Sequence, residues 1–102
     1  MITEAMIQRA LIERHTAGVQ EKLAGARVAI AGLGGLGSNV AVALARTGVG
    51  YLHLLDYDKV DISNLNRQQY FIRHIGMYKT DALTEELREI NPYLHITAEC
   101  VK

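Results

Sequence analysis

The chain has 102 residues, 49% of them apolar and 22% charged, and its formal net charge at pH 7 is zero. This length fits one small domain or part of a larger one, and the apolar fraction is high enough for a packed core. The balance of 11 basic and 11 acidic residues argues against nucleic acid as the main partner. The composition is therefore not that of a disordered chain, and nothing in it suggests a polyanion-binding surface.

The sequence predicts no membrane segment and no secretory leader. Its longest apolar runs are far shorter than the roughly 20 residues that span a bilayer. A single cysteine, Cys100, makes no intrachain disulfide and no structural zinc site, which fits a reducing compartment. We expect a cytoplasmic protein that does not bind membranes.

The N-terminal residues carry a helical pattern. Apolar residues at helical spacing predict a helix over residues 3–13, with Thr3 as its N-cap. Gly18 interrupts that helix, and a second short helix over residues 19–23 ends near Gly25.

Residues 27–56 predict a strand, a glycine loop, a helix and a second strand. The short apolar run 27–31 lies between glycines, a pattern typical of a parallel strand buried on both faces. The alanine-rich residues 38–47 predict a helix that Gly48 ends. Residues 51–55 predict the second strand, with Asp56 at its end.

The glycine loop, residues 32–37, matches the pattern G-x-G-x-x-G. Gly32 permits a tight turn off the strand, Gly34 lets the backbone approach a phosphate, and Gly37 allows close contact between helix and strand. The following helix directs its N-terminal amides at the anion. Asp56 stands where a carboxylate meets a ribose hydroxyl. These features predict nucleotide binding but leave NAD and ATP both open.

Residues 57–78 predict a long irregular loop rich in Asn, Gln and Asp. Loops of this length are uncommon inside compact domains and are often functional. Thr80 or Asp81 is the expected N-cap of a helix that runs to about Glu89, and Asn91-Pro92 ends it.

Alternating apolar residues from Leu94 to Cys100 predict a third strand. Strands separated by helices imply a parallel sheet with right-handed crossovers. The predicted fold class is α/β: a Rossmann-like parallel sheet, representing the first three strands of a doubly wound fold, preceded by an N-terminal helix.

The loop after Asp56 distinguishes between the two nucleotides. Its sequence LLDYDKVDISNLNRQ, with GLGGLG before it and Gly76-x-x-Lys79 after it, closely resembles the E1-like superfamily of ThiF, MoeB and ubiquitin-activating enzymes over about residues 20–95. The segment RQQYFIRHIGMYKTDAL is most similar to short bacterial ThiF-type proteins. The resemblance implies ATP-dependent activation of the C-terminal glycine of a carrier protein. For ThiF that carrier is ThiS, on the route to the thiamin thiazole.

The resemblance also implies a domain organisation. Residues 1–25 would be an N-terminal helical segment, and residues 26–102 the N-terminal half of an ATP-binding Rossmann-like domain. In the family, an acid that handles Mg²⁺, part of the adenine pocket and the carrier-docking surface follow later in the chain. We therefore expect a truncated domain that is inactive alone, from a homodimeric enzyme that uses ATP and Mg²⁺.

Adenylation requires cations and hydrogen-bond donors directed at the phosphates. The matching family positions are Arg67, which offers a fork of donors, and Lys79, a point charge near the start of a helix. The expected nucleotide-binding residues are Gly32, Gly34, Gly35, Gly37, Asp56, Asp58, Ser63, Asn64 and Arg14. No general base is needed, because the attacking carboxylate is already ionised at neutral pH.

Simpler interpretations stand beside these assignments. Arg67 is alternatively a solvated loop residue, and Lys79 an ordinary lysine at a helix start. Asp58 is as well explained as a loop-capping acid, since aspartate readily bonds nearby backbone in turns. Arg14 would supply the arginine that family members bring to the triphosphate from an N-terminal segment, but Arg9 competes with it and a surface role is simpler.

Other reactive or apolar residues are expected to be structural. Cys100 lies on the apolar face of a predicted strand, where a free cysteine behaves as a small buried hydrophobe. The four histidines lack metal-ligand spacing, so no metal site is predicted. The cluster at residues 70–72 is expected to plug the space under the loop.

Three further functions remain open at this level. One is a tRNA-modifying dehydratase of the same superfamily. Another is an NAD-dependent dehydrogenase half-domain, and the last is a non-catalytic nucleotide-binding or dimerisation module.

Overall fold

The structure is a computed structural model that describes residues 1–6, 9–10, 17–65 and 68–101. Strands β1 (Arg27–Ala31), β2 (Tyr51–Asp56) and β3 (His95–Cys100) form one parallel sheet in the order β1-β2-β3. The helices are α2 (Ala17–Gly25), α3 (Gly35–Thr47) and α4 (Lys79–Ile90), with short 3₁₀ turns η1 (Ile62–Asn64) and η2 (Ile72–His74). The predicted Rossmann-like arrangement is confirmed.

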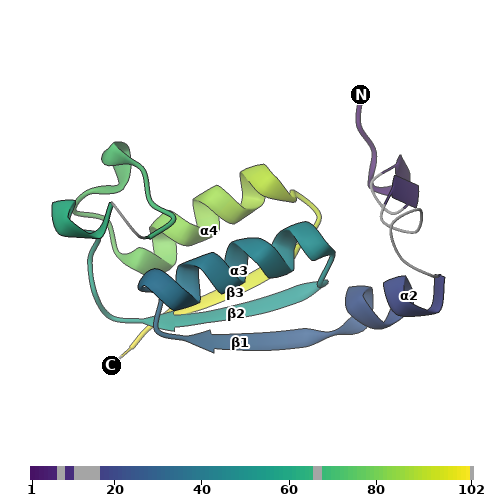
Figure 1. The fold of residues 1–102 in the computed structure, drawn as a ribbon, viewed down its shortest axis with the longest axis horizontal. Helices are drawn as coiled ribbons and strands as arrows, with labels where there is room; N and C mark the ends of the chain where they lie inside the picture. Colours follow the sequence, from purple (N-terminus) through teal and green to yellow (C-terminus); the bar gives the residue numbers. More distant parts are fainter. Residues whose placement is uncertain (7–8, 11–16, 66–67, 102) are drawn as a thin grey trace.

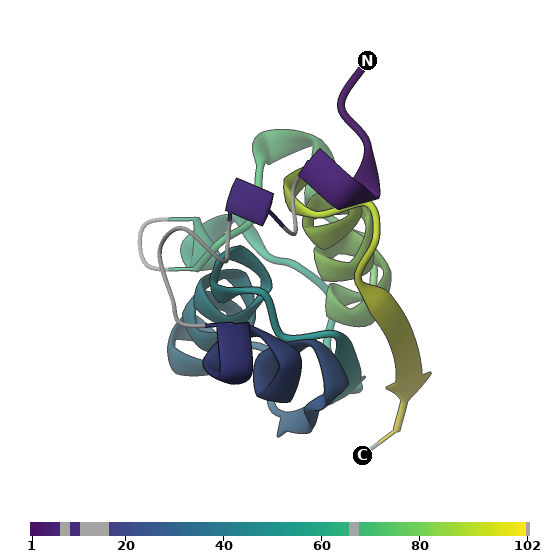
Figure 2. The same cartoon turned by 90° about the vertical axis from the view of Figure 1, so that its right-hand side faces the viewer.

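Helices α3 and α4 lie on the same face of the sheet, as Figures 1 and 2 show. Helix α3 packs on β1, and α4 packs on β2, β3 and α3. Apolar side chains between these layers form the core. It consists of Ile30, Leu33, Ala41, Ala45, Val49, Leu52, Leu54, Val60, Tyr70, Ala82, Leu83, Leu87 and Leu94.

The expectation that β1 is buried on both faces was wrong. Its side chains at Arg27, Ala29 and Ala31 are exposed, and only Ile30 is buried. The physical reason is that both covering helices occupy one face, and no described element covers the other. An apolar run in a sequence indicates that a strand is buried on the face that helices cover. It does not show whether the second face of the strand is covered as well.

Cys100 was also predicted wrongly, because its side chain is exposed rather than part of the core. It is the last residue of β3, an edge strand whose neighbours in the described structure are β2 and α4. Thr97, Ala98 and Glu99 beside it are exposed as well. The alternating pattern correctly predicted a strand, but an edge strand loses cover on one side.

Most helix boundaries follow the sequence signals. The Met6 amide donates to Thr3 Oγ1 at 3.2 Å, which confirms the predicted N-cap. Gly48 ends α3 in the left-handed region, with φ of 106°. Helix α4 starts at Lys79 with Tyr78 as N-cap and no side-chain cap, so the expected cap at Thr80 or Asp81 was wrong. The Lys79 amide instead donates to the Asp58 carbonyl at 2.9 Å.

The glycine loop and the long loop 57–78 both lie at the carboxyl end of the strands, opposite to the N-terminal segment (Figure 1). The long loop carries η1, η2 and a bridge between Lys59 and Tyr78. The predicted hydrophobic plug is right only for Tyr70, which is 5% exposed, because Phe71 and Ile72 are 48% and 79% exposed. In the described part of the chain, no helix is long and apolar enough to cross a membrane.

Gly37 in α3 packs closely against the end of β1 and the residue that follows it. A Cβ atom there would lie 1.8 Å from the Gly32 carbonyl oxygen and 3.4 Å from the Ile30 side chain. We predict that Gly37→Ala lowers the free energy of unfolding by about 2 kcal/mol or more, because α3 must move off the sheet. Urea unfolding followed by circular dichroism measures the change.

Gly18→Ala is the matched control. Apart from its chain neighbours and the backbone of α2, no atom of the described residues lies within 4 Å of a Cβ built on Gly18, which sits in α2. Alanine there should leave stability unchanged or raise it by up to about 1 kcal/mol, as expected inside a helix. Equal stability of the two variants would contradict the close-packing argument.

Candidate functional site

The glycine loop turns the chain from β1 into α3. Gly32 has φ of +88°, a conformation that side chains disfavour, and its amide donates to the Leu55 carbonyl at 2.8 Å. Gly34 is the N-cap of α3, and Gly35 is the first residue of that helix. The loop therefore exposes the N-terminus of a 13-residue helix at the carboxyl end of the sheet.

Asp56 connects this loop to the second strand. Its Oδ2 accepts the Leu33 amide at 2.6 Å, and its Oδ1 accepts the Asp58 amide at 2.7 Å. Charge-assisted hydrogen bonds of this kind are stronger than neutral ones. Asp56 thus positions the glycine loop directly, and its expected contact with a ribose stays a prediction.

Asp58 and Lys79 lie next along the same edge. The Lys79 amide donates to the Asp58 carbonyl, so the start of α4 is held beside the end of β2. Lys79 is 7% exposed. Among the described residues, no carboxylate lies within 4.0 Å of its ammonium group. A largely buried cation without a carboxylate partner suits a site that receives an anion.

Two of the other predicted site residues, Ser63 and Asn64, lie in η1 of the long loop. Ser63 is exposed in η1, and its amide donates to Asp61 Oδ1 at 3.4 Å, a contact that aspartate typically makes in turns. Asn64 is the last residue of η1. Arg67 and Arg14 lie outside the described residues, so their roles stay predictions.

A second set of contacts ties the long loop to the glycine loop, and sequence reasoning missed it. The Tyr70 hydroxyl donates to the Leu33 carbonyl at 2.7 Å. Ser38 Oγ donates to the Gly34 carbonyl at 2.6 Å and accepts the Gln69 amide at 3.2 Å. The available signal was a tyrosine and two glutamines directly after the Arg67 motif, but only the fold shows which atoms they meet.

Burial perturbs three titratable groups behind this loop. Burial, reinforced by the charges of Asp56 and Glu86, raises the pKa of Tyr70. Burial also raises the pKa of Glu86, although the charge of Arg73 opposes the shift. It lowers the pKa of His74, with the Arg73 charge adding to the effect and Glu89 opposing it. Tyr70 is therefore a neutral hydrogen-bond donor at physiological pH.

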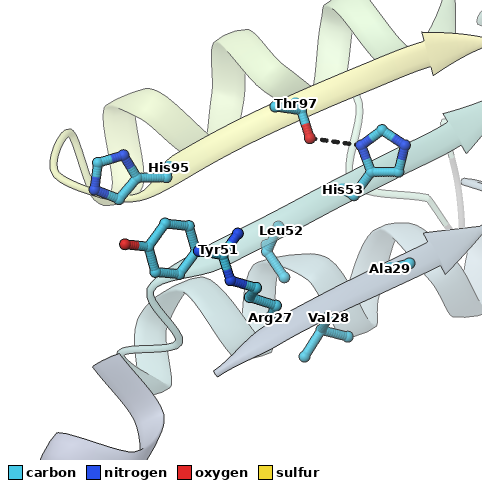
Figure 3. Close-up of a pocket in the computed structure, with 8 residues that line it drawn as sticks. All are labelled: Arg27, Val28, Ala29, Tyr51, Leu52, His53, His95 and Thr97. Atoms are coloured by element: carbon cyan, nitrogen blue, oxygen red, sulfur yellow. Dashed lines mark hydrogen bonds between the residues drawn. The ribbon is translucent and has the colours of Figure 1, made fainter. Parts of the chain in front are cut away.

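Among the hollows of the described structure, two bear on where a ligand would bind. One of about 480 Å³ runs along β1 and the start of α3, and glycines of the loop line part of it. The other, of about 260 Å³, lies on the uncovered sheet face (Figure 3). There the Arg27 guanidinium lies 4.3 Å from the centre of the Tyr51 ring, which stacks on His95. Of the predicted site residues that the structure describes, none lines this second hollow.

No group of three or more potential metal ligands occurs in the described ranges of the chain. Both carboxylate oxygens of Asp56 are occupied by backbone amides.

Comparison with known proteins gives a consistent result. The model of the ThiF family matches residues 7–102. The tRNA threonylcarbamoyladenosine dehydratase of Escherichia coli K12 is 43% identical over 75 residues, covering 72% of this chain and 28% of that protein. Ubiquitin-like modifier-activating enzyme 5 of Arabidopsis thaliana is 51% identical over 65 residues, covering 64% of this chain and 15% of that protein. The chain thus spans less than half the length of these relatives.

Solved structures agree with the sequence matches. The crystal structure of the E. coli tRNA dehydratase in complex with ATP superimposes with a TM-score of 0.88 at 35% identity, covering 99% of this chain and 43% of that one. The complex of E. coli MccB with ATP gives a TM-score of 0.80 at 36% identity, covering 82% of this chain and 26% of that one.

His74 offers a test of the loop through pH. Its side chain is fully buried, and Nδ1 accepts the Phe71 amide at 2.9 Å, so the folded state favours the neutral imidazole. Below about pH 6.5 the unfolded chain binds a proton here that the folded chain excludes. Stability should therefore fall as pH drops from 7.5 to 5, by up to about 1.4 kcal/mol per pH unit from this group.

The comparison variant is His74→Asn, whose side-chain oxygen can still accept the Phe71 amide but does not titrate. Urea unfolding of both proteins across this pH range isolates the histidine contribution as a difference. The stability advantage of the unaltered protein should shrink as the solution becomes acidic. A difference that stays constant with pH would contradict the neutral, buried histidine.

Proposed function

The chain belongs to the ThiF family, and we propose that the protein is an ATP-dependent adenylyltransferase for a ubiquitin-like, ThiS-like sulfur carrier in thiamin thiazole biosynthesis. In this proposal, residues 1–25 are the N-terminal helical segment and residues 26–102 are the first half of the ATP-binding domain. The enzyme would act in the cytoplasm as a homodimer. Because the chain covers a minor part of its relatives, the complete reaction is proposed for the full-length protein.

The observation that carries the proposal is the meeting of three features at one edge of the sheet. The glycine loop presents a helix N-terminus, Asp56 holds that loop, and the start of α4 brings Lys79 beside Asp58. Amides and a helix N-terminus attract phosphates, and a cation near them neutralises the charge that builds up during transfer. Two solved relatives contain ATP, which supports ATP as the nucleotide.

The proposed reaction uses the carboxylate of the carrier's C-terminal glycine as the nucleophile. One carboxylate oxygen forms a bond to the α-phosphorus of ATP while the bond to the bridging oxygen breaks, releasing pyrophosphate and leaving an acyl-adenylate. The carboxylate is already ionised at neutral pH, so no side chain has to remove a proton. Lys79 and Arg67 would stabilise the triphosphate, Asp56 and Asp58 would handle the ribose and the loop, and Ser63, Asn64 and Arg14 would complete the contacts.

A dehydratase acting on tRNA is the second candidate. The favouring observation is the similarity to the E. coli tRNA dehydratase, which extends over 99% of this chain in structure. Both candidates require ATP, so they differ in the group that is activated. Incubating the full-length protein with ATP and either a glycine-ended carrier or tRNA distinguishes them by which addition accelerates ATP turnover. The dehydrogenase alternative predicts thermal stabilisation by NAD and not by ATP.

Lys79 provides the direct test of the adenylylation site. We predict that Lys79→Met in the full-length protein lowers the rate of ATP–pyrophosphate exchange, in the presence of carrier, by about 100-fold or more. Removing one preorganised electrostatic contact to a transition state has that magnitude. The exchange of radiolabelled pyrophosphate into ATP measures it.

Lys59→Met is the matched control from the same loop. Lys59 is exposed, and its ammonium lies 5.1 Å from the centre of the Tyr78 ring. Its removal should change the exchange rate by no more than about threefold, because an exposed cation–π contact is weak. Equal losses in the two variants, or no loss in either, would refute the role of Lys79.

A further inference from the structure

Leu33 is held at both of its backbone polar groups. Its amide donates to Asp56 Oδ2 at 2.6 Å, and its carbonyl accepts the Tyr70 hydroxyl at 2.7 Å. The Leu33 side chain is 0% exposed and belongs to the core. The orientation of Leu33, the second residue of the glycine loop, is therefore fixed by its amide, by its carbonyl and by its side chain.

The planarity of the peptide bond transmits this orientation to the next residue. In a trans peptide the carbonyl of one residue and the amide of the following residue point in opposite directions. Fixing the Leu33 carbonyl against Tyr70 therefore directs the Gly34 amide away from Tyr70. Gly34 is the N-cap of α3, the position where a helix N-terminus meets an anion.

We propose that Tyr70 is a positioning residue for the triphosphate: its hydroxyl holds the Leu33 carbonyl so that the Gly34 amide is directed at the phosphates. This inference rests on the proposed use of ATP. Tyr70 does not touch the nucleotide itself but determines the shape of the loop that does. A phenylalanine would fill the same apolar space without this bond.

The surroundings of Tyr70 indicate that its hydroxyl contributes a specific hydrogen bond in addition to the packing of the ring. Tyr70 is 5% exposed, and a buried hydroxyl is costly unless it is hydrogen-bonded. Burial and the nearby charges of Asp56 and Glu86 raise the pKa of Tyr70, which keeps it protonated and able to donate. The bond should therefore persist over the whole pH range in which the protein is folded.

The long loop also reaches the next peptide of the glycine loop, between Gly34 and Gly35, through hydrogen bonds of Ser38. Ser38 Oγ donates to the Gly34 carbonyl, and the Gln69 amide donates to Ser38 Oγ. Residues 69 and 70 thus hold two consecutive peptides of the glycine loop. The long loop, which also contains Arg67 and leads to Lys79, would in this way be aligned with the phosphate-binding amides.

The test is Tyr70→Phe in the full-length protein, with Tyr93→Phe as the matched control. Tyr93 also donates its hydroxyl to a backbone carbonyl, that of Ile2, at 3.2 Å, but it lies between α4 and β3, before the amino end of that strand. Calorimetry measures the affinities for ATP and for adenosine, which lacks phosphates. Urea unfolding without ligand measures stability.

Tyr70→Phe should weaken ATP binding about tenfold, equivalent to 1.4 kcal/mol, with less than a twofold effect on adenosine. Tyr93→Phe should leave both affinities unchanged. Loss of stability in Tyr70→Phe with unchanged ATP affinity would overturn the inference, and so would an equal loss for ATP and adenosine. The first outcome would leave the proposed function intact, whereas failure of the unaltered protein to bind ATP would overturn both.

The amide resonance of Gly34 in the nucleotide-free protein gives a second measurement. It should shift in Tyr70→Phe and stay in place in Tyr93→Phe, because only Tyr70 sets the orientation of that peptide. An unshifted Gly34 resonance in a folded Tyr70→Phe protein would also overturn the inference.

Discussion

The carboxylate of Asp56 is the contact on which the candidate site depends. It accepts one amide from the glycine loop and one from the start of the long loop, at 2.6 and 2.7 Å. Because both acceptor oxygens belong to one side chain at the end of β2, the two loops share a single anchor on the sheet. The loop ends that follow β1 and β2 are thereby kept together without a bound ligand.

A second set of hydrogen bonds joins later residues of the long loop to the glycine loop and to the residues that follow β2. Near the middle of the long loop, Tyr70 and Gln69 bond to the glycine loop and to Ser38 behind it, and at its end the Lys79 amide bonds back to Asp58. The long loop is therefore held at its beginning, near its middle and at its end. That arrangement gives a loop with little regular structure a defined position, although ordering so many residues costs conformational entropy.

The sheet has two different faces. Helices α3 and α4 bury one, while exposed Arg27, half-buried Tyr51 and exposed His95 form a stack on the other (Figure 3). The same asymmetry explains why the buried-strand pattern of residues 27–31 overestimated the cover of β1. It also accounts for exposed Cys100 at the end of an edge strand, where apolar alternation had suggested a core position.

The sequence alone determined the order of strands and helices, the glycine loop with Asp56 after it, and the start of a helix near Lys79. These features depend on signals between residues a few positions apart, such as apolar period, glycine and proline. Only the tertiary structure decided that Tyr70 meets Leu33, that Gln69 meets Ser38, and that one sheet face is open. Such contacts join residues more than 30 positions apart, and no local pattern records them, because they arise from how the layers pack.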